Sequence, residues 1–174
     1  MKKIIVINGA GGVGKDTMVD FAKKRYMVWN CSSIEPIKQA AKILGWGHEA
    51  KDDRSRKFLS DLKMLSTEYN DFPFNYIVRY ADSFLNCYRH GDIMFVHIRE
   101  PKEIKKFVDA VNNAYKVKPI TLLIRRDAVV HEYGNIADDG VENFQYDYVF
   151  NNDGTIEESE KAFTRFLESI MEQP

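Results

Sequence analysis

Hydrophobic and polar residues alternate along the chain in blocks that predict strands and helices in turn. The first block, 2–8, is a nearly continuous apolar run, which is typical of a strand buried in a parallel sheet. Weaker strand patterns follow at 27–32, 92–98, 118–124 and 147–150. Helix patterns lie at 14–26, 33–45, 54–69, 74–89, 101–113 and 155–174. This alternation predicts an α/β fold with a five-stranded, mainly parallel sheet.

Two stretches interrupt the alternation. One is a run of helices at about 34–90, and the other is a polar, irregular segment at about 125–146. Each follows the carboxyl end of a predicted strand, which is where folds of this class place their ligands. We therefore expect both stretches to carry binding residues.

Composition narrows the class of protein without naming a function. Residues 1–174 have the length of a single domain, with 44% hydrophobic and 29% charged residues. The net charge of −1 gives no reason to expect a nucleic-acid or membrane partner. No apolar run approaches the roughly 20 residues that span a bilayer, and Cys31 and Cys87 lack metal-ligand spacing. We expect a cytoplasmic protein.

A glycine-rich turn, INGAGGVGKDT at 7–17, follows the first predicted strand. It has the G-x-x-x-x-G-K spacing of a phosphate-binding loop, in which glycines let backbone amides face phosphate oxygens. The helix that follows adds the partial positive charge of its amino terminus. The residues expected to contact a nucleotide are Gly9, Gly11, Gly12, Val13, Gly14, Lys15, Asp16 and Thr17.

Asp16 stands where this type of loop usually places Ser or Thr. An acidic residue suits the first turn of a helix, but here its carboxylate would also face triphosphate oxygens and repel them. A divalent cation between the two removes the conflict, because a carboxylate is a good ligand for magnesium. The sequence therefore predicts ATP bound with Mg²⁺, with Asp16 as a metal ligand, directly or through water.

The chain resembles a branch of P-loop kinases that contains phage-type deoxynucleoside monophosphate kinases and animal-type phosphomevalonate kinases. The similar segments are GKDT, IEPIKQAAK at 34–42, DDRSRKFLSDLKMLSTEYN at 52–70, VHIREPKEI at 96–104 and DYVFNNDGTIEE at 147–158. The resemblance implies a three-layer P-loop kinase fold, with an acceptor-binding helical insert at about 34–90 and a short lid at about 125–146. His97 departs from the pattern, since the group usually has an acidic residue there. The lid sequence NIADDGVENFQ departs as well.

Basic residues are the candidates for phosphoryl transfer, which depends on positioning and positive charge more than on covalent chemistry. The expected catalytic residues are Lys15, Arg99, Arg125 and Arg126. The expected acceptor-binding residues are Lys38, Arg54, Arg56, Arg79 and Arg99. An arginine at the start of the lid would pack on adenine or reach the γ-phosphate. Asn152 and Gly154 are expected near adenine, although a plain turn before a capped helix also explains them.

These features favour ATP-dependent transfer to a nucleoside or deoxynucleoside monophosphate. Two alternatives stay open: a kinase of the same fold acting on phosphomevalonate or dephospho-coenzyme A, and a nucleotide-binding module without turnover. A GTPase switch is disfavoured because its N-K-x-D and D-x-x-G motifs are absent from the sequence. The partner expected is a small-molecule phosphate acceptor, with the protein a monomer or a homodimer.

Overall fold

The computed structural model describes residues 2–47, 52–87, 91–127 and 140–173. The strands are β1 (Lys3–Asn8), β2 (Val28–Ser32), β3 (Ile93–His97), β4 (Ile120–Arg125) and β5 (Tyr148–Asn151). The helices are α1 (Lys15–Lys23), α2 (Glu35–Ile43), α3 (Asp53–Asn70), α4 (Phe72–Asn86), α5 (Pro101–Tyr115) and α6 (Ile156–Met171), with a 3-10 turn η1 (Val141–Asn143). Every predicted strand and helix is therefore confirmed, with ends that differ by a few residues.

The strands form one sheet in the order β2-β3-β1-β4-β5, and every described pairing is parallel. The first strand of the chain is thus the middle strand of the sheet, with β3 on one side and β4 on the other. Because all strands run the same way, the turns after β1, β3, β4 and β5 meet at one edge of the sheet. In parallel sheets this edge is where ligands bind.

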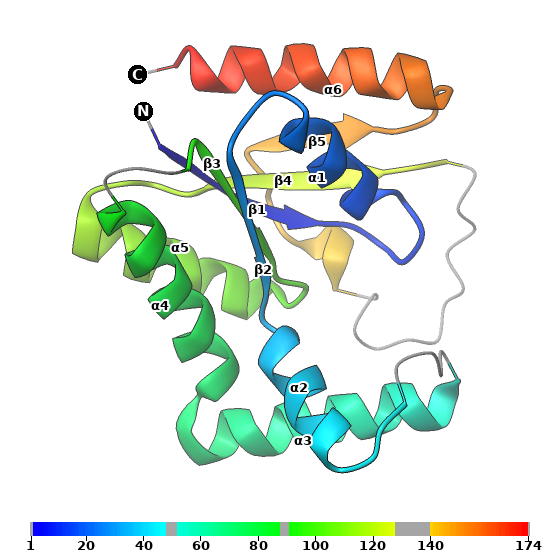
Figure 1. The fold of residues 1–174 in the computed structure, drawn as a ribbon, viewed down its shortest axis with the longest axis vertical. Helices are drawn as coiled ribbons and strands as arrows, with labels where there is room; N and C mark the ends of the chain where they lie inside the picture. The colour runs from blue at the N-terminus through cyan, green and yellow to red at the C-terminus, as the bar shows by residue number, and fades with distance from the viewer. Residues whose placement is uncertain (1, 48–51, 88–90, 128–139, 174) are drawn as a thin grey trace.

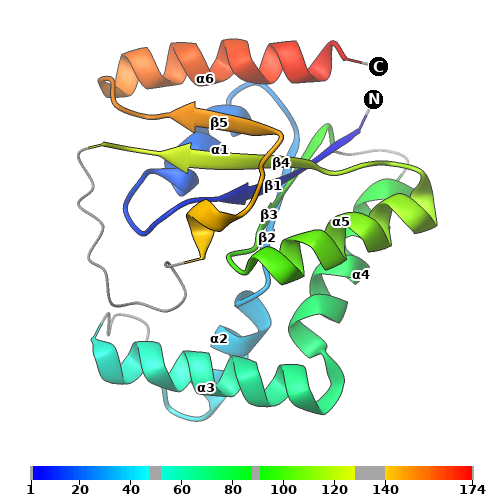
Figure 2. The ribbon, with the colours of Figure 1, turned by 180° about the vertical axis from the view of Figure 1, so that it is seen from behind.

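Helices cover both faces of the sheet and make three layers (Figures 1 and 2). On one face, Ile5 and Ile7 of β1 pack in a core with residues of α1 and α6. On the other face, Ile4 and Val6 pack in a second core with residues of α4 and α5. Burial on both faces explains why β1 reads as a continuous apolar run.

The helical stretch after β2 divides into two parts. α4 lies in the helical layer, where Ile77, Ala81 and Phe84 are buried against the sheet. α2 and α3 instead project past the carboxyl end of β2 (Figure 1), and Ser55 is the buried residue of α3. Asp71, at a φ of 57°, is the one residue between α3 and α4.

Parts of two predicted regions lie outside the described residues. These are 128–139, most of the predicted lid, and 48–51 and 88–90 of the predicted insert. The described end of the lid segment, from residue 140, contains η1. Across the described helices, none has both the length and the apolar composition for a membrane crossing.

Removing a large side chain from the core between the sheet and α6 should destabilise the fold. Phe163 is 0% exposed and its ring centroid lies 5.1 Å from that of Phe150. We expect Phe163→Ala to lower the free energy of unfolding by about 3–5 kcal/mol, measured by urea denaturation. Ile156→Ala, at a 69% exposed position of the same helix, should change it by about 0.5 kcal/mol or less. Equal losses in the two variants would contradict the burial assigned to Phe163.

Candidate functional site

The glycine-rich turn passes close to two other segments of the sheet edge. Gly9 has a φ of 145°, and a Cβ atom there would lie 2.4 Å from the carbonyl oxygen of Ile124 at the end of β4. Gly14 has a φ of 95°, and its Cβ would lie 2.5 Å from the side-chain nitrogen of Asn152. A side chain at either position would thus be both strained and obstructed. Glycine at these positions lets the backbone follow this path.

Lys15 begins α1 and its side chain turns back over the loop. Its ammonium donates hydrogen bonds to the carbonyl oxygens of Gly9, at 2.5 Å, and Ala10, at 2.7 Å. The positive charge is therefore held at the mouth of the turn. Gly14 precedes the helix without a capping side chain, so the first-turn amides of α1 are available to an anion.

Asp16 and Thr17 follow in the first turn of α1, and both are exposed. A carboxylate and a hydroxyl beside a phosphate-binding loop are oxygen donors of the kind that magnesium prefers. The Asp16 carboxylate therefore fits the role of a Mg²⁺ ligand that the sequence predicts, and the Thr17 hydroxyl is a second oxygen donor beside it. Within the described part of the chain, no group of three or more His, Cys, Asp or Glu side chains could hold a metal ion.

Asn152 fixes the loop from the β5 side. It is 7% exposed, its side-chain nitrogen donates to the carbonyl oxygen of Val13 at 2.8 Å, and its backbone nitrogen donates to Arg125 at 2.7 Å. These bonds use the Asn152 amide to position the loop, and its predicted contact with the cofactor stays a prediction. Gly154, predicted with it, packs against Glu158 of α6.

Asn8, the last residue of β1, is a site residue that the sequence analysis missed. It is 1% exposed, and its side-chain oxygen accepts from the backbone nitrogen of Gly9 at 2.8 Å. Its side-chain nitrogen donates to the carbonyl oxygen of Arg99 at 3.0 Å and to the hydroxyl of Tyr146 at 2.7 Å. Asn8 therefore ties the loop to the turn after β3 and to the segment before β5. The sequence signal that could have identified Asn8 is a polar residue at the end of an apolar strand.

His97, the last residue of β3, was noted in the sequence only as a departure from the kinase pattern and was given no role there. It lies in register between Ile7 of β1 and Ser32 of β2. Its ring nitrogen Nε2 lies 2.9 Å from the side-chain oxygen of Asn30, and the ring is half-buried. His97 therefore stands at the sheet edge directly beside the strand that leads into the phosphate loop.

Four of the predicted site residues act electrostatically on His97. Burial lowers the pKa of its imidazole to about 4, and the Asp16 carboxylate opposes that shift. The cationic groups of Lys15, Arg99 and Lys38 lower the pKa further. The charges that shift this pKa therefore come from the first turn of α1, from the turn after β3 and from α2.

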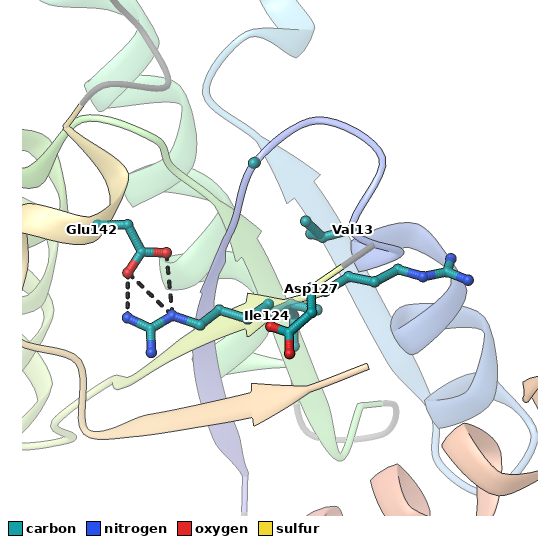
Figure 3. A pocket seen from close by; sticks show the side chains of 7 residues that line it. Val13, Ile124, Asp127 and Glu142 are labelled. Carbon is teal, nitrogen blue, oxygen red and sulfur yellow. Dashed lines mark hydrogen bonds and ion pairs between the residues drawn. The ribbon is translucent and has the colours of Figure 1, made fainter. Parts of the chain in front are cut away.

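Arg125 ends β4 and Arg126 follows it, beside a cavity of about 390 Å³ (Figure 3). The residues lining it are Ala10, Val13, Ile124, Arg125, Arg126, Asp127 and Glu142. Arg125 forms an ion pair with Glu142, in which its Nε donates to both carboxylate oxygens, at 3.2 and 3.1 Å. Arg126 is exposed. The cavity joins the phosphate loop to the start of the predicted lid.

The remaining predicted arginines lie on the helices after β2. Arg54 and Arg56 are exposed near the start of α3, where Arg56 pairs with Asp53 at 3.5 Å, and Arg79 is exposed on α4. Their role in acceptor binding stays a prediction.

Comparison with known proteins bears on the fold. No protein-family model matches the chain, and no curated protein does. The Mycobacterium tuberculosis APS kinase in complex with AMPPNP and APS is similar in structure, with a TM-score of 0.53 and 12% identity, over 96% of this chain and 98% of that one. Thymidylate kinase from Candida albicans gives a TM-score of 0.52 at 12% identity, over 97% and 92%. The P-loop kinase fold is thereby confirmed, while the branch suggested by the sequence stays a prediction.

Loss of the Asn152 amide should loosen the phosphate loop. In Asn152→Ala the buried carbonyl of Val13 loses its partner, so we expect the free energy of unfolding to fall by about 1–3 kcal/mol and the amides of 9–14 to exchange hydrogen faster. Asn151→Ala, at the exposed neighbouring position that ends β5, is the matched control. Unchanged exchange in the loop of Asn152→Ala would show that this bond does not hold it.

The neutral state of His97 should make stability depend on pH. Because its pKa is lowered from 6.5 to about 4, the unfolded chain binds more protons than the folded chain between these pH values. The stabilisation is complete above pH 6.5 and is lost as the pH falls through 4. Relative to His97→Gln, measured in EDTA by urea denaturation, the wild type should lose about 2 kcal/mol between pH 7 and pH 4, a value reduced for partial exposure. Parallel curves for the two proteins would contradict the shift.

Proposed function

We propose that this protein transfers the γ-phosphoryl group of ATP to a nucleoside or deoxynucleoside monophosphate. The observation that carries the proposal is a glycine loop held in left-handed backbone conformations, with the Lys15 ammonium bonded over its carbonyl oxygens at the carboxyl edge of the sheet. A site of this composition suits a polyanion. The shared fold supports the proposal, since the similar structures are described as an APS kinase, with AMPPNP bound, and a thymidylate kinase.

The donor nucleotide would lie along the loop. The first-turn amides of α1 face its phosphates, and Lys15 moves from the loop carbonyls to the β- and γ-phosphate oxygens. The cavity beside Arg125 and Arg126 takes the adenine, with a guanidinium plane stacked on the base. Because Glu142 holds Arg125 in an ion pair, Arg126 is the better placed of the two to stack. Asn152 and Asn8 keep the loop in shape.

The metal accompanying the nucleotide would be held by Asp16, with Thr17 beside it. When bound, Mg²⁺ would neutralise phosphate charge and remove the repulsion between the triphosphate and Asp16. Asp16 reaches this position because it follows Lys15 directly in the first turn of α1 and its carboxylate is exposed.

The acceptor would approach from the side of α2 and α3. Arg99 and Lys38 are the groups proposed to hold its phosphate, since Arg99 follows the carboxyl end of β3 and Lys38 lies on α2, the helix that follows β2. A guanidinium binds a phosphate through two parallel hydrogen bonds, which also orients it for in-line attack. Arg54, Arg56 and Arg79 would add contacts from α3 and α4, and the lid segment 125–146 would exclude water on closing.

A panel of acceptors tests the proposal. With ATP and Mg²⁺, at least one nucleoside or deoxynucleoside monophosphate should yield ADP and a nucleoside diphosphate, detected by chromatography. Lys15→Ala should lower the rate by about a hundredfold or more, because it removes the cation that faces the transferring group. Lys23→Ala, on the exposed face of the same helix and paired with Asp20, should retain the wild-type rate.

The outcomes separate the alternatives. Transfer to phosphomevalonate or dephospho-coenzyme A, with none to any monophosphate tested, would replace the proposed acceptor and keep the reaction class. ATP binding without transfer to any acceptor would favour a nucleotide-binding module. Equal activity of Lys15→Ala and wild type would reject the assignment of the loop.

A further inference from the structure

The alternation of side chains in β3 directs His97 to the face covered by α1. Ile93 and Phe95 pack in the core that contains Met18 and Val19 of α1, whereas Met94 and Val96 pack in the opposite core. Successive residues of a strand point to opposite faces, so the side chain of His97 continues the row of Phe95. It therefore points to the layer of α1, at the edge of the sheet where that helix begins.

The hydrogen bond to Asn30 sets which ring nitrogen of His97 is free to bind a ligand. Asn30 belongs to β2 and lies on the same face, and its side-chain oxygen can only accept. Nε2 of His97 must then carry the proton, which leaves the lone pair on Nδ1. A hydrogen bond of this kind, from one ring nitrogen to a carbonyl oxygen, is how proteins orient a histidine that binds a metal through the other nitrogen.

Asp16 brings an oxygen donor to the same region. Side chains of an α-helix tilt toward its amino terminus, so the carboxylate in the first turn of α1 is directed to the sheet edge. Asp16 lies in the first turn of the helix that covers the face to which His97 points, and its charge acts on the ring. One oxygen donor and one nitrogen donor, from two different elements, therefore lie at the same edge of the sheet and on the same face of it.

We infer that Asp16 and Nδ1 of His97 together bind the divalent cation that accompanies the nucleotide, as a mixed oxygen and nitrogen pair. The inference rests on the proposed nucleotide binding, because two protein donors leave the remaining positions to phosphate oxygens and water. An imidazole is a good ligand for first-row transition metals, whereas Mg²⁺ prefers oxygen. The site should therefore favour Mn²⁺ over Mg²⁺ more strongly than an all-oxygen site does.

Pulsed electron paramagnetic resonance of Mn²⁺ gives a direct test. The sample is the full chain with AMPPNP and Mn²⁺, with the histidines labelled with ¹⁵N so that the nitrogens of adenine are distinguished from imidazole. We expect a ¹⁵N coupling from a directly bound imidazole in the wild type. The coupling should be absent in His97→Gln, a variant of similar size that can still donate to Asn30.

A second measurement compares the two metals. We expect the ratio of AMPPNP affinities in Mn²⁺ and in Mg²⁺, from calorimetry, to fall by about tenfold in His97→Gln and in His97→Asp. His97→Asp restores an oxygen donor, so it should keep nucleotide affinity in Mg²⁺ while losing the nitrogen coupling. A positioning role of His97 without metal contact would lower both affinities together and leave the ratio unchanged.

The results that overturn the inference differ from those that overturn the proposed function. If AMPPNP and Mn²⁺ bind to the wild type and no imidazole coupling appears, His97 is not a metal ligand, and the proposed transfer reaction stands. If AMPPNP does not bind in the presence of either metal, the proposed nucleotide site is wrong, and this inference is wrong as well. An absent imidazole coupling in the wild type is enough to reject His97 as a metal ligand, even if a variant fails to fold.

Discussion

The site depends on how closely the backbone of the glycine loop approaches its neighbours. Gly9 lies against the carbonyl of Ile124, and Gly14 lies against the amide of Asn152, at distances that exclude any side chain. The same amide donates a hydrogen bond to the carbonyl oxygen of Val13, so a buried group holds the end of the loop. Amides fixed in this way need no reorganisation when an anion arrives, and such preorganisation makes hydrogen-bond donors effective in binding and transfer.

The sequence predicts the parts of this architecture that are encoded locally. The apolar run of β1, the glycine spacing and the capping box from Thr155 to Glu158 each lie within a few residues, and each is confirmed. The grouping around His97 could not be predicted in the same way. It depends on the strand order β2-β3-β1, which sets Ser32, His97 and Ile7 side by side, and no local pattern states which strands will be neighbours.

Asn152 shows a second limit of sequence reasoning. A polar residue in a glycine-containing turn has the same pattern whether its side chain faces a ligand or the protein. Only the register of β5 against β4, where Asn151 pairs with Arg125, brings its amide under the phosphate loop. The helices after β2 show the same limit. Both α3 and α4 carry apolar residues at helical spacing, but α4 packs in the core, whereas α3 projects beyond it.

The charges at the sheet edge explain why a histidine suits position 97. Asp16 already supplies a carboxylate from α1, and a second acid at the end of β3 would put two like charges near each other, which raises the pKa of one of them. Burial and the cations of Lys15, Lys38 and Arg99 instead keep the imidazole neutral. Position 97 thus adds a donor atom without adding charge. In the proposed site the positive charge would be left for phosphate, and the residues at 16 and 97 would act as two parts of one electrostatic arrangement.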